Sequence, residues 1–302
     1  MARRQFPLLA DLIDEIKDMV DQGSDTAGQR TWQEREFVRK CNAAERFIRD
    51  EITGKDEHFF VRRSTLTIAS GATSVAVPDD CVGIVKMVIR SSAGDHTGEE
   101  LRLLTGAEVG STFGAYYRPM TTTLEFPLTP NESLSVELYY LGEHLPLAHG
   151  VVVDAGATTL QIASYELRQD SAYNTQTIYI VSGTGSNQSR VVTAYVGTTQ
   201  VATVAAWGTV PDVTSVYSTR PDLPWQAQEA FKLKVAIDLL AKPNDERYEQ
   251  YAGDFQVALA KLMKTIGIGN RARLKRVRND RGVILGDPFP AGVVSGAGSW
   301  RR

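Results

Sequence analysis

The stretch that most constrains the fold is 172–217, with the sequence AYNTQTIYIVSGTGSNQSRVVTAYVGTTQVATVAAWGTVPDVTSVY. Threonine, serine, glycine, valine and alanine dominate the wider region 150–217, and charged residues are rare in it. Such β-branched runs between turn sequences are typical of short strands. Strands are expected at 159–163, 177–182, 189–195 and 200–205, with turns at 183–187 and 197–198. The region is therefore predicted to be a compact all-β module.

Two amphipathic helices are expected at the start of the chain, because apolar residues repeat there at helical spacing. These residues are Leu8, Leu12, Ile16 and Met19 in the first helix, and Phe37, Cys41, Ala44, Ile48 and Ile52 in the second. Thr31 and Glu34 form a T-x-x-E capping box that predicts the start of the second helix. Gly23 and Gly54 are expected to end the two helices.

A small sheet is expected between these helices and the module. Strand-like segments cover 58–69, 74–78, 82–90, 121–126 and 133–141, and 101–109 is expected to be a short helix. In the last strand Leu134, Val136, Leu138 and Tyr140 fall on one face, as the twofold period of a strand requires.

A second helix pair is expected after Pro224, with Pro243 between its members. In the first of these helices the apolar residues form two rows, so one row is expected to face its own bundle and the other the sheet or a neighbouring subunit. The candidate subunit-interface residues are Phe231, Leu233, Val235, Ile237 and Leu240. The second helix carries an apolar stripe of Tyr248, Tyr251, Phe255, Leu259, Leu262 and Ile266, and Gly267 and Gly269 are expected to end it.

The C-terminal segment 270–302 is expected to order only on a partner, because it is rich in glycine yet carries many large apolar side chains. Its basic run contains Arg271, Arg273, Lys275, Arg276, Arg278 and Arg281, and its candidate apolar anchors are Ile284, Phe289 and Trp300. The arginines would pair with carboxylates of a partner. The basic run could instead contact DNA or extend the last helix into solvent, and the aromatic residues could pack on their own domain.

Composition limits the class of protein. The 302 residues carry 33 Lys and Arg against 36 Asp and Glu, a net charge of −3, which argues against a protein devoted to holding DNA. No apolar run approaches the length of a membrane helix, and the first residues do not resemble a secretory signal. The two cysteines, Cys41 and Cys81, lie apart in apolar surroundings and predict neither a disulfide framework nor a metal site.

No catalytic or cofactor-binding constellation is found, and neither a metal nor a cofactor is expected. The four histidines show no metal-ligand spacing, and His144 and His149 are interpreted as residues of a polar loop. The Ser-Gly-Thr-Gly-Ser sequence at 182–186 lacks the lysine and helix of a phosphate loop, so a hairpin turn is expected. Tyr173, Tyr195 and Trp207 could line a sugar site, but core aromatic residues are the preferred interpretation.

The chain also shows two resemblances to known proteins. The helix pairs, the segments VAVPDDCVGIVKMVI and LSVELYYLGEHLP, and the basic run RARLKRVR resemble a phage head-to-tail adaptor (connector) protein of the kind found beneath the portal. The stretch 172–217 resembles a β module that recurs in structural proteins of tailed-phage virions. The resemblance implies an α+β fold with an adaptor core at 1–148 and 222–269, an inserted all-β module at 149–221 and a C-terminal docking tail at 270–302.

The resemblance also implies a function. Such a protein would be a non-enzymatic virion component, assembled in the host cytoplasm, that forms a ring of twelve neighbouring adaptor subunits and docks on the portal protein by its C-terminal tail. A downstream tail or nozzle protein would follow, genomic DNA would pass through the centre without sequence-specific binding, and no membrane would be involved. The alternatives are a tail-exterior fibre or decoration protein that binds a surface ligand through the β module, and a tail-associated hydrolase.

Overall fold

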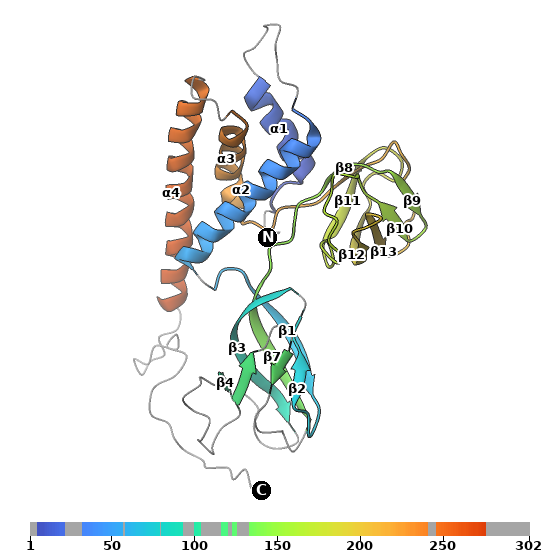
Figure 1. Cartoon of the computed structure of the whole chain (residues 1–302). Helices are drawn as coiled ribbons and strands as arrows, with labels where there is room; N and C mark the ends of the chain where they lie inside the picture. The colour runs from blue at the N-terminus through green and yellow to red at the C-terminus, as the bar shows by residue number, and fades with distance from the viewer. Residues whose placement is uncertain are drawn as a thin grey trace. The chain divides into compact units, whose positions relative to one another are not determined.

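The structure is a computed structural model that describes residues 5–21, 32–56, 58–78, 80–92, 100–103, 116–119, 123–125, 133–240 and 246–275. By its internal contacts the chain divides into two units. The first comprises Met1–Lys55 with His144–Ile268, and the second is built on Asp56–Glu143. Among the described residues the fold is mixed α+β, with four α-helices and mainly antiparallel sheets (Figure 1).

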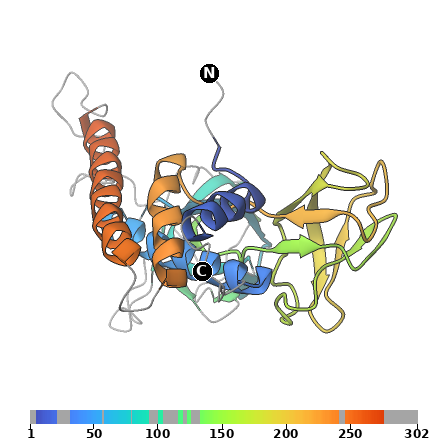
Figure 2. The same cartoon turned by 90° about the horizontal axis from the view of Figure 1, so that it is seen from above.

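The helices of the first unit are α1 (Leu9–Asp21), α2 (Glu34–Lys55), α3 (Gln228–Leu240) and α4 (Glu246–Lys275). A short 3₁₀ helix, Trp225–Ala227, leads into α3. The α3 helix packs against both α1 and α2, as the view from above shows (Figure 2). Eight of its thirteen residues are buried, which is the pattern of a central helix.

The amphipathic stripe predicted for α2 is confirmed, because Phe37, Ile48 and Ile52 are fully or almost fully buried. The stripe predicted for α1 is confirmed at Leu12 and Ile16, whereas Leu8 precedes the helix and neither it nor Met19 is buried. The predicted capping box at Thr31 and Glu34 is wrong in position. The α2 helix begins at Glu34, and the amide of Gln33 donates to Glu36 Oε2 at 3.2 Å, so Glu36 supplies the reciprocal carboxylate of the helix start. Thr31 lies outside the described residues.

The α4 helix extends past the predicted end. Gly267 and Gly269 lie inside it, and it continues to Lys275. A glycine inside a helix costs only about 1 kcal/mol relative to alanine, so tertiary contacts can override it. The buried side chains Phe255, Leu262 and Ile266 anchor the preceding turns, and they belong to the predicted apolar stripe.

The β module is a seven-stranded antiparallel sheet in the order β8-β14-β11-β12-β13-β10-β9. The strands are β8 (His149–Val151), β9 (Asp154–Gly156), β10 (Thr159–Gln161), β11 (Thr177–Ser182), β12 (Ser189–Val196), β13 (Val201–Val204) and β14 (Val216–Ser218). The two edge strands are consecutive in the chain. Between them the amide of Val152 donates to Ser215 O and that of Val153 to Gln161 O, both at 2.9 Å, so this short connection joins opposite ends of the sheet.

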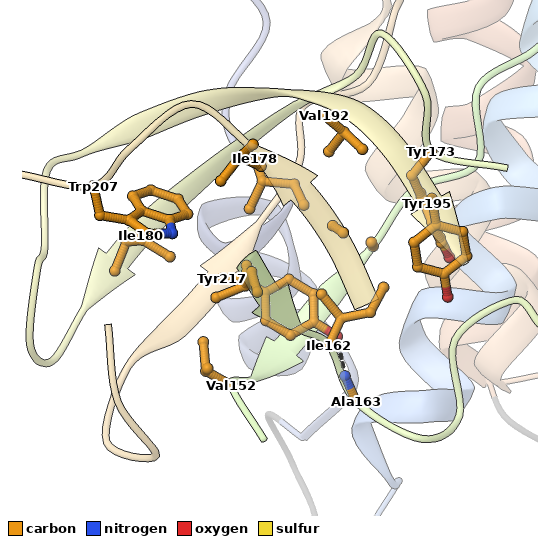
Figure 3. Packing of buried hydrophobic residues seen from close by; sticks show 14 residues of the cluster. Val152, Ile162, Ala163, Tyr173, Ile178, Ile180, Val192, Tyr195, Trp207 and Tyr217 are labelled. Carbon is orange, nitrogen blue, oxygen red and sulfur yellow. Dashed lines mark hydrogen bonds between the residues drawn. The ribbon is translucent and has the colours of Figure 1, made fainter. Parts of the chain in front are cut away.

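Aromatic and branched side chains fill the module. Tyr173, Ile178, Ile180 and Tyr217 are at most 1% exposed. Figure 3 shows the ring of Tyr217 beside Ile162, with its hydroxyl directed at the amide of Ala163. That amide donates to the hydroxyl at 3.0 Å, so a core aromatic residue also satisfies a buried backbone group.

The turn between β11 and β12 confirms the hairpin predicted at 183–187. Gly183 has a φ of +78°, and a Cβ atom there would lie 2.2 Å from the carbonyl oxygen of Thr214. Only glycine meets both the backbone angle and the close approach. The glycines of this sequence therefore serve a turn rather than a phosphate loop.

The second unit holds a seven-stranded sheet in the order β1-β7-β3-β4-β5-β6-β2, in which only the β4–β5 pair is parallel. Its strands are β1 (Val61–Ile68), β2 (Ser74–Ala76), β3 (Cys81–Ser92), β4 (Glu100–Leu103), β5 (Tyr116–Pro119), β6 (Thr123–Glu125) and β7 (Leu134–Gly142). The predicted inner face of β7 is confirmed, because Leu134, Val136, Leu138 and Tyr140 are all buried.

The short helix expected at 101–109 is wrong for the part that the structure describes. Residues 100–103 form strand β4, in which Leu101 is buried and pairs with Met87 of β3. Cross-strand pairing with a buried partner outweighs a weak local helix preference. Residues 104–109 lie outside the described part of the chain.

The two units of the structure group the helices and sheets differently from the domains predicted from the sequence. The sequence pattern groups the helices with the small sheet and sets the β module apart. In the structure the helices share a unit with the β module, and the small sheet forms its own unit. Polar contacts join the helices to the module, and the residues that make them have no repeating pattern in the sequence.

Candidate functional site

The candidate docking residues of the C-terminal segment fall largely outside the described chain. Arg271, Arg273 and Lys275 belong to the backbone of α4. Arg276, Arg278, Arg281, Ile284, Phe289 and Trp300 lie outside the described residues. Their proposed contacts therefore remain a prediction.

The candidate subunit-interface residues are buried within a single chain. Phe231, Leu233, Val235, Ile237 and Leu240 are each at most 9% exposed. Phe231, for example, makes an edge-to-face contact with Phe6 at a ring-centroid distance of 5.8 Å. Both apolar rows of α3 are therefore covered within the protein's own first unit, whereas one row was expected to face the sheet or a neighbouring subunit.

The aromatic residues considered for a sugar site are core residues, as preferred from the sequence. Tyr173, Tyr195 and Trp207 are at most 7% exposed. Tyr173 and Tyr195 pack edge-to-face with ring centroids 4.8 Å apart. Neither ring presents a face to a sugar.

The most concentrated set of buried polar groups lies where the β module joins the helices. We call this region the root of the module: the incoming segment 144–149, the outgoing segment 217–222 and the part of α2 that contacts them. The two segments run side by side, because β8 pairs with β14 through His149 and Ser218. Ala148 and Thr219 continue the pairing, with Thr219 N donating to Ala148 O at 2.9 Å and Ala148 N to Thr219 Oγ1 at 2.9 Å.

One face of α2 supplies the polar groups of the root. Glu34, Asn42, Glu45 and Arg49 are separated by eight, three and four residues, so helical geometry aligns them along one side. The central residue, Asn42, forms two hydrogen bonds to one residue: its amide donates to Leu147 O at 3.0 Å, and its carbonyl accepts from Leu147 N at 2.7 Å. This pair fixes the incoming segment on the helix.

At one end of this face the buried carboxylate of Glu45 engages both segments. Its Oε1 accepts a 2.7 Å hydrogen bond from the amide of Asp222 in the outgoing segment. Its Oε2 lies 3.1 Å from Nε2 of His144 in the incoming segment. Arg49, beside it on α2, contacts the carboxylate of Asp222 at 3.3 Å. Glu45 is fully buried, and a carboxylate in such a place requires charged or hydrogen-bonding partners.

At the other end His149 meets Glu34. The distance from His149 Nε2 to Glu34 Oε2 is 3.6 Å, and Lys17 of α1 contacts the other carboxylate oxygen at 3.2 Å. The imidazole of His149, with a smaller effect of Lys17, lowers the pKa of Glu34 to about 2. Glu34 is therefore ionised throughout the ordinary pH range.

Glu166 lies on the module side of the same histidine and is only 5% exposed. Three groups donate to its carboxylate: the Tyr173 hydroxyl at 2.8 Å, the Tyr217 hydroxyl at 3.0 Å and the backbone amide of His149 at 3.1 Å. Burial raises the pKa of Glu166 to about 7, and these hydrogen bonds limit the rise. The carboxylate thus joins the module's aromatic core to its root.

The start of α1 also contacts the outgoing segment. The amide of Leu9 donates to Thr219 O and the amide of Ala10 to Ser218 Oγ, both at 3.0 Å. The first amides of a helix have no partner inside the helix, so the module's outgoing segment satisfies them. The module is therefore connected to both N-terminal helices.

The polar groups of the root attach the module to the helices. The carboxylates of the root contact groups from other elements, and within the described ranges no group of three or more His, Cys, Asp or Glu side chains could hold a metal ion. Nor does any helix among the described residues have the length and apolar character to cross a membrane. No protein-family model matches the chain, and no curated protein matches its sequence.

The root has no counterpart among the sequence predictions. The sequence predicts polar loop residues at His144 and His149, whereas the side chain of His144 is 12% exposed and that of His149 7%. The available signal was the presence of three charged residues, Glu34, Glu45 and Arg49, on an otherwise apolar face of α2. It did not reveal the partners, because these lie about a hundred residues or more away in the chain.

Proposed function

We propose that this chain is a non-enzymatic structural adaptor of a tailed-phage virion, which forms a ring beneath the portal, joins head to tail and surrounds the DNA passage. The partners would be the portal protein, neighbouring copies of the chain and a downstream tail protein. The proposal rests on the resemblance of the helix pairs and strand segments to head-to-tail adaptors, and on the character of the β module.

The observation that carries the proposal is the pairing of the module's two ends. His149 pairs with Ser218 and Gly150 with Tyr217, so the chain enters and leaves the module at neighbouring positions. A domain inserted into a pre-existing fold needs ends that lie close together. The helices before and after the module pack on each other, since α3 contacts both α1 and α2. This is the arrangement expected of an adaptor core that accepted an additional β module.

The helix pair 224–266 is the expected source of the ring contacts. Because the apolar residues of α3 are buried in their own chain, we propose that α4 supplies ring contacts. Only three of its described side chains are buried, and Val257 is 70% exposed. A specific ring interface would bury on the order of 1,600 Å² between neighbours.

The proposal is tested by assembly with purified portal, using mass measurement and negative-stain imaging. The full chain should form rings, alone or on the portal. A chain lacking 282–302 should keep its circular dichroism spectrum and melting temperature but fail to assemble. Normal assembly of the truncated chain would contradict docking through this segment, and a trimeric rod would favour the fibre alternative.

A charge-reversal pair sharpens the test of the basic run. Arg276→Glu with Arg278→Glu should weaken portal binding at least tenfold if these residues pair with carboxylates. Lys261→Glu with Lys264→Glu, on exposed positions of α4, is the matched control and should bind normally. If DNA is the partner instead, six cations predict a slope near −5 for log affinity against log salt, from about 0.9 per phosphate.

A further inference from the structure

We infer that the root is a pH-dependent fastening, in which the β module is held to α2 more tightly at mildly acidic than at mildly alkaline pH through the His149–Glu34 and His144–Glu45 contacts. This inference does not depend on the proposed function, because it concerns only how two parts of one unit are held together.

Both histidines lie beside carboxylates of α2. His144 and His149 stand at the two ends of the incoming segment, and their Nε2 atoms lie 3.1 Å and 3.6 Å from carboxylate oxygens of Glu45 and Glu34. Between them Asn42 holds the backbone of Leu147, so the segment cannot slide along the helix without breaking these contacts. A histidine–carboxylate contact is an ion pair only when the imidazole is protonated, which for an ordinary histidine changes near pH 6.5.

Neighbouring charges add to the effect at His149. Lys17 and, next to it, Asp14 face Glu34 from α1, with Lys17 Nζ 3.7 Å from Asp14 Oδ1. On the module side stands Glu166, whose pKa of about 7 means that it gains a negative charge in the same pH range. Glu166 thus adds negative charge beside the His149–Glu34 contact as the pH rises.

Burial raises the pKa values of the Tyr165, Tyr173 and Tyr217 hydroxyls, so these stay neutral. At the other end of the root Glu45 and Asp222 face Arg49 and His144. With a neutral His144 imidazole, two carboxylates share one guanidinium there, and one of them, Glu45, is fully buried.

The result is a partly buried junction that becomes more negative as the pH rises. Repulsion among the carboxylates and loss of two ion pairs then favour opening of the root, while the cores on either side of it keep their apolar contacts. An increase in pH should therefore loosen the attachment before it unfolds the module or the helices.

Hydrogen–deuterium exchange of the full chain at pH 5.5 and pH 8, corrected for the intrinsic exchange rate, tests this inference. The opening equilibrium constant of the backbone amides in 144–149 and 217–222 should be about tenfold larger at pH 8. That of the amides in the buried centre of α3 should not change. Unchanged opening of the root in the wild-type protein would overturn the inference without any variant.

Substitutions test whether the contact between His149 and Glu34 produces the pH-dependent opening of the root. In His149→Gln and in Glu34→Gln the increase should fall to threefold or less. The control His58→Gln, at an exposed position of the second unit, should keep the full tenfold increase. A full increase in either root variant would show that the contacts of His149 do not produce the pH dependence, and this would also overturn the inference.

Discussion

The core of the β module and its root illustrate two ways in which one chain holds itself together. The core is apolar, with fourteen buried side chains that include Tyr173, Tyr217 and Trp207. The root consists mainly of hydrogen bonds and ion pairs between segments far apart in the chain. Apolar burial has no preferred direction, whereas the polar contacts of the root require one orientation. The core therefore stabilises the module, and the root determines where the module is attached.

The largest expected effect comes from the core. Ile180→Ala removes a side chain that is 1% exposed, and it should lower the free energy of unfolding by about 2–5 kcal/mol, because a cavity remains. Val181→Ala, the next residue of β11, changes a half-buried side chain and should cost well under half as much. Urea unfolding of both variants measures the difference. Equal losses would mean that β11 does not have the inner and outer faces described.

Glu166 links the core of the module to its root, and its contribution to the free energy of unfolding should depend on pH. Because its folded pKa of about 7 exceeds the ordinary value of 4.5, the folded protein binds the proton more tightly than the unfolded chain does. Stability is therefore lost as the pH rises from 4.5 through 7, by about 3 kcal/mol from this group.

Glu166→Gln should remove this loss, since its side chain takes no charge. Unfolding free energies of the variant and the wild-type protein should be similar below pH 4.5, separate between pH 4.5 and 7 as the variant gains relative stability, and differ by a constant amount above that range. Tyr hydroxyls can rotate to suit the amide, so the hydrogen bonds need not be lost. A difference that stays constant from pH 5 to pH 8 would contradict the assignment.

Asn42→Ala should have an intermediate, local effect. It removes both hydrogen bonds to the backbone of Leu147, which should weaken the root by about 1–3 kcal/mol. Hydrogen exchange at 144–149 should accelerate while the strands of the module remain protected. Arg46→Ala, on the exposed side of α2, is the control and should leave the exchange unchanged.

The smallest effect is expected for Glu34, because its side chain is 41% exposed and solvent weakens its ion pairs. Its lowered pKa means that the stabilisation is present above pH 4.5 and is lost as the pH falls through about 2. The titration midpoint of its carboxyl carbon, followed by NMR, should rise in His149→Gln and rise less in Lys17→Met. An equal or larger rise in the lysine variant would contradict the conclusion that His149 lowers the pKa of Glu34 more than Lys17 does.

The elements that could be predicted from the sequence are those whose side chains follow a local period. The stripe of α2, the inner face of β7 and strand β11 were predicted at or near their observed positions. The hairpin at Gly183 was predicted from a glycine-rich turn sequence between two strand-like runs, and the positive φ of Gly183 agrees with that turn. Errors arose where a distant partner outweighed local preference, as in β4, whose Leu101 pairs with Met87, and in α4, which passes two glycines.

The sequence by itself determined that this chain has helices before and after an all-β module, because apolar periodicity and turn residues are properties of neighbouring positions. Only the tertiary structure decided that α3 is buried on both sides, and that His144 and His149 meet carboxylates of α2. The physical reason is that a buried charge is acceptable only beside its partner, and that partner is chosen by the fold rather than by its distance along the chain.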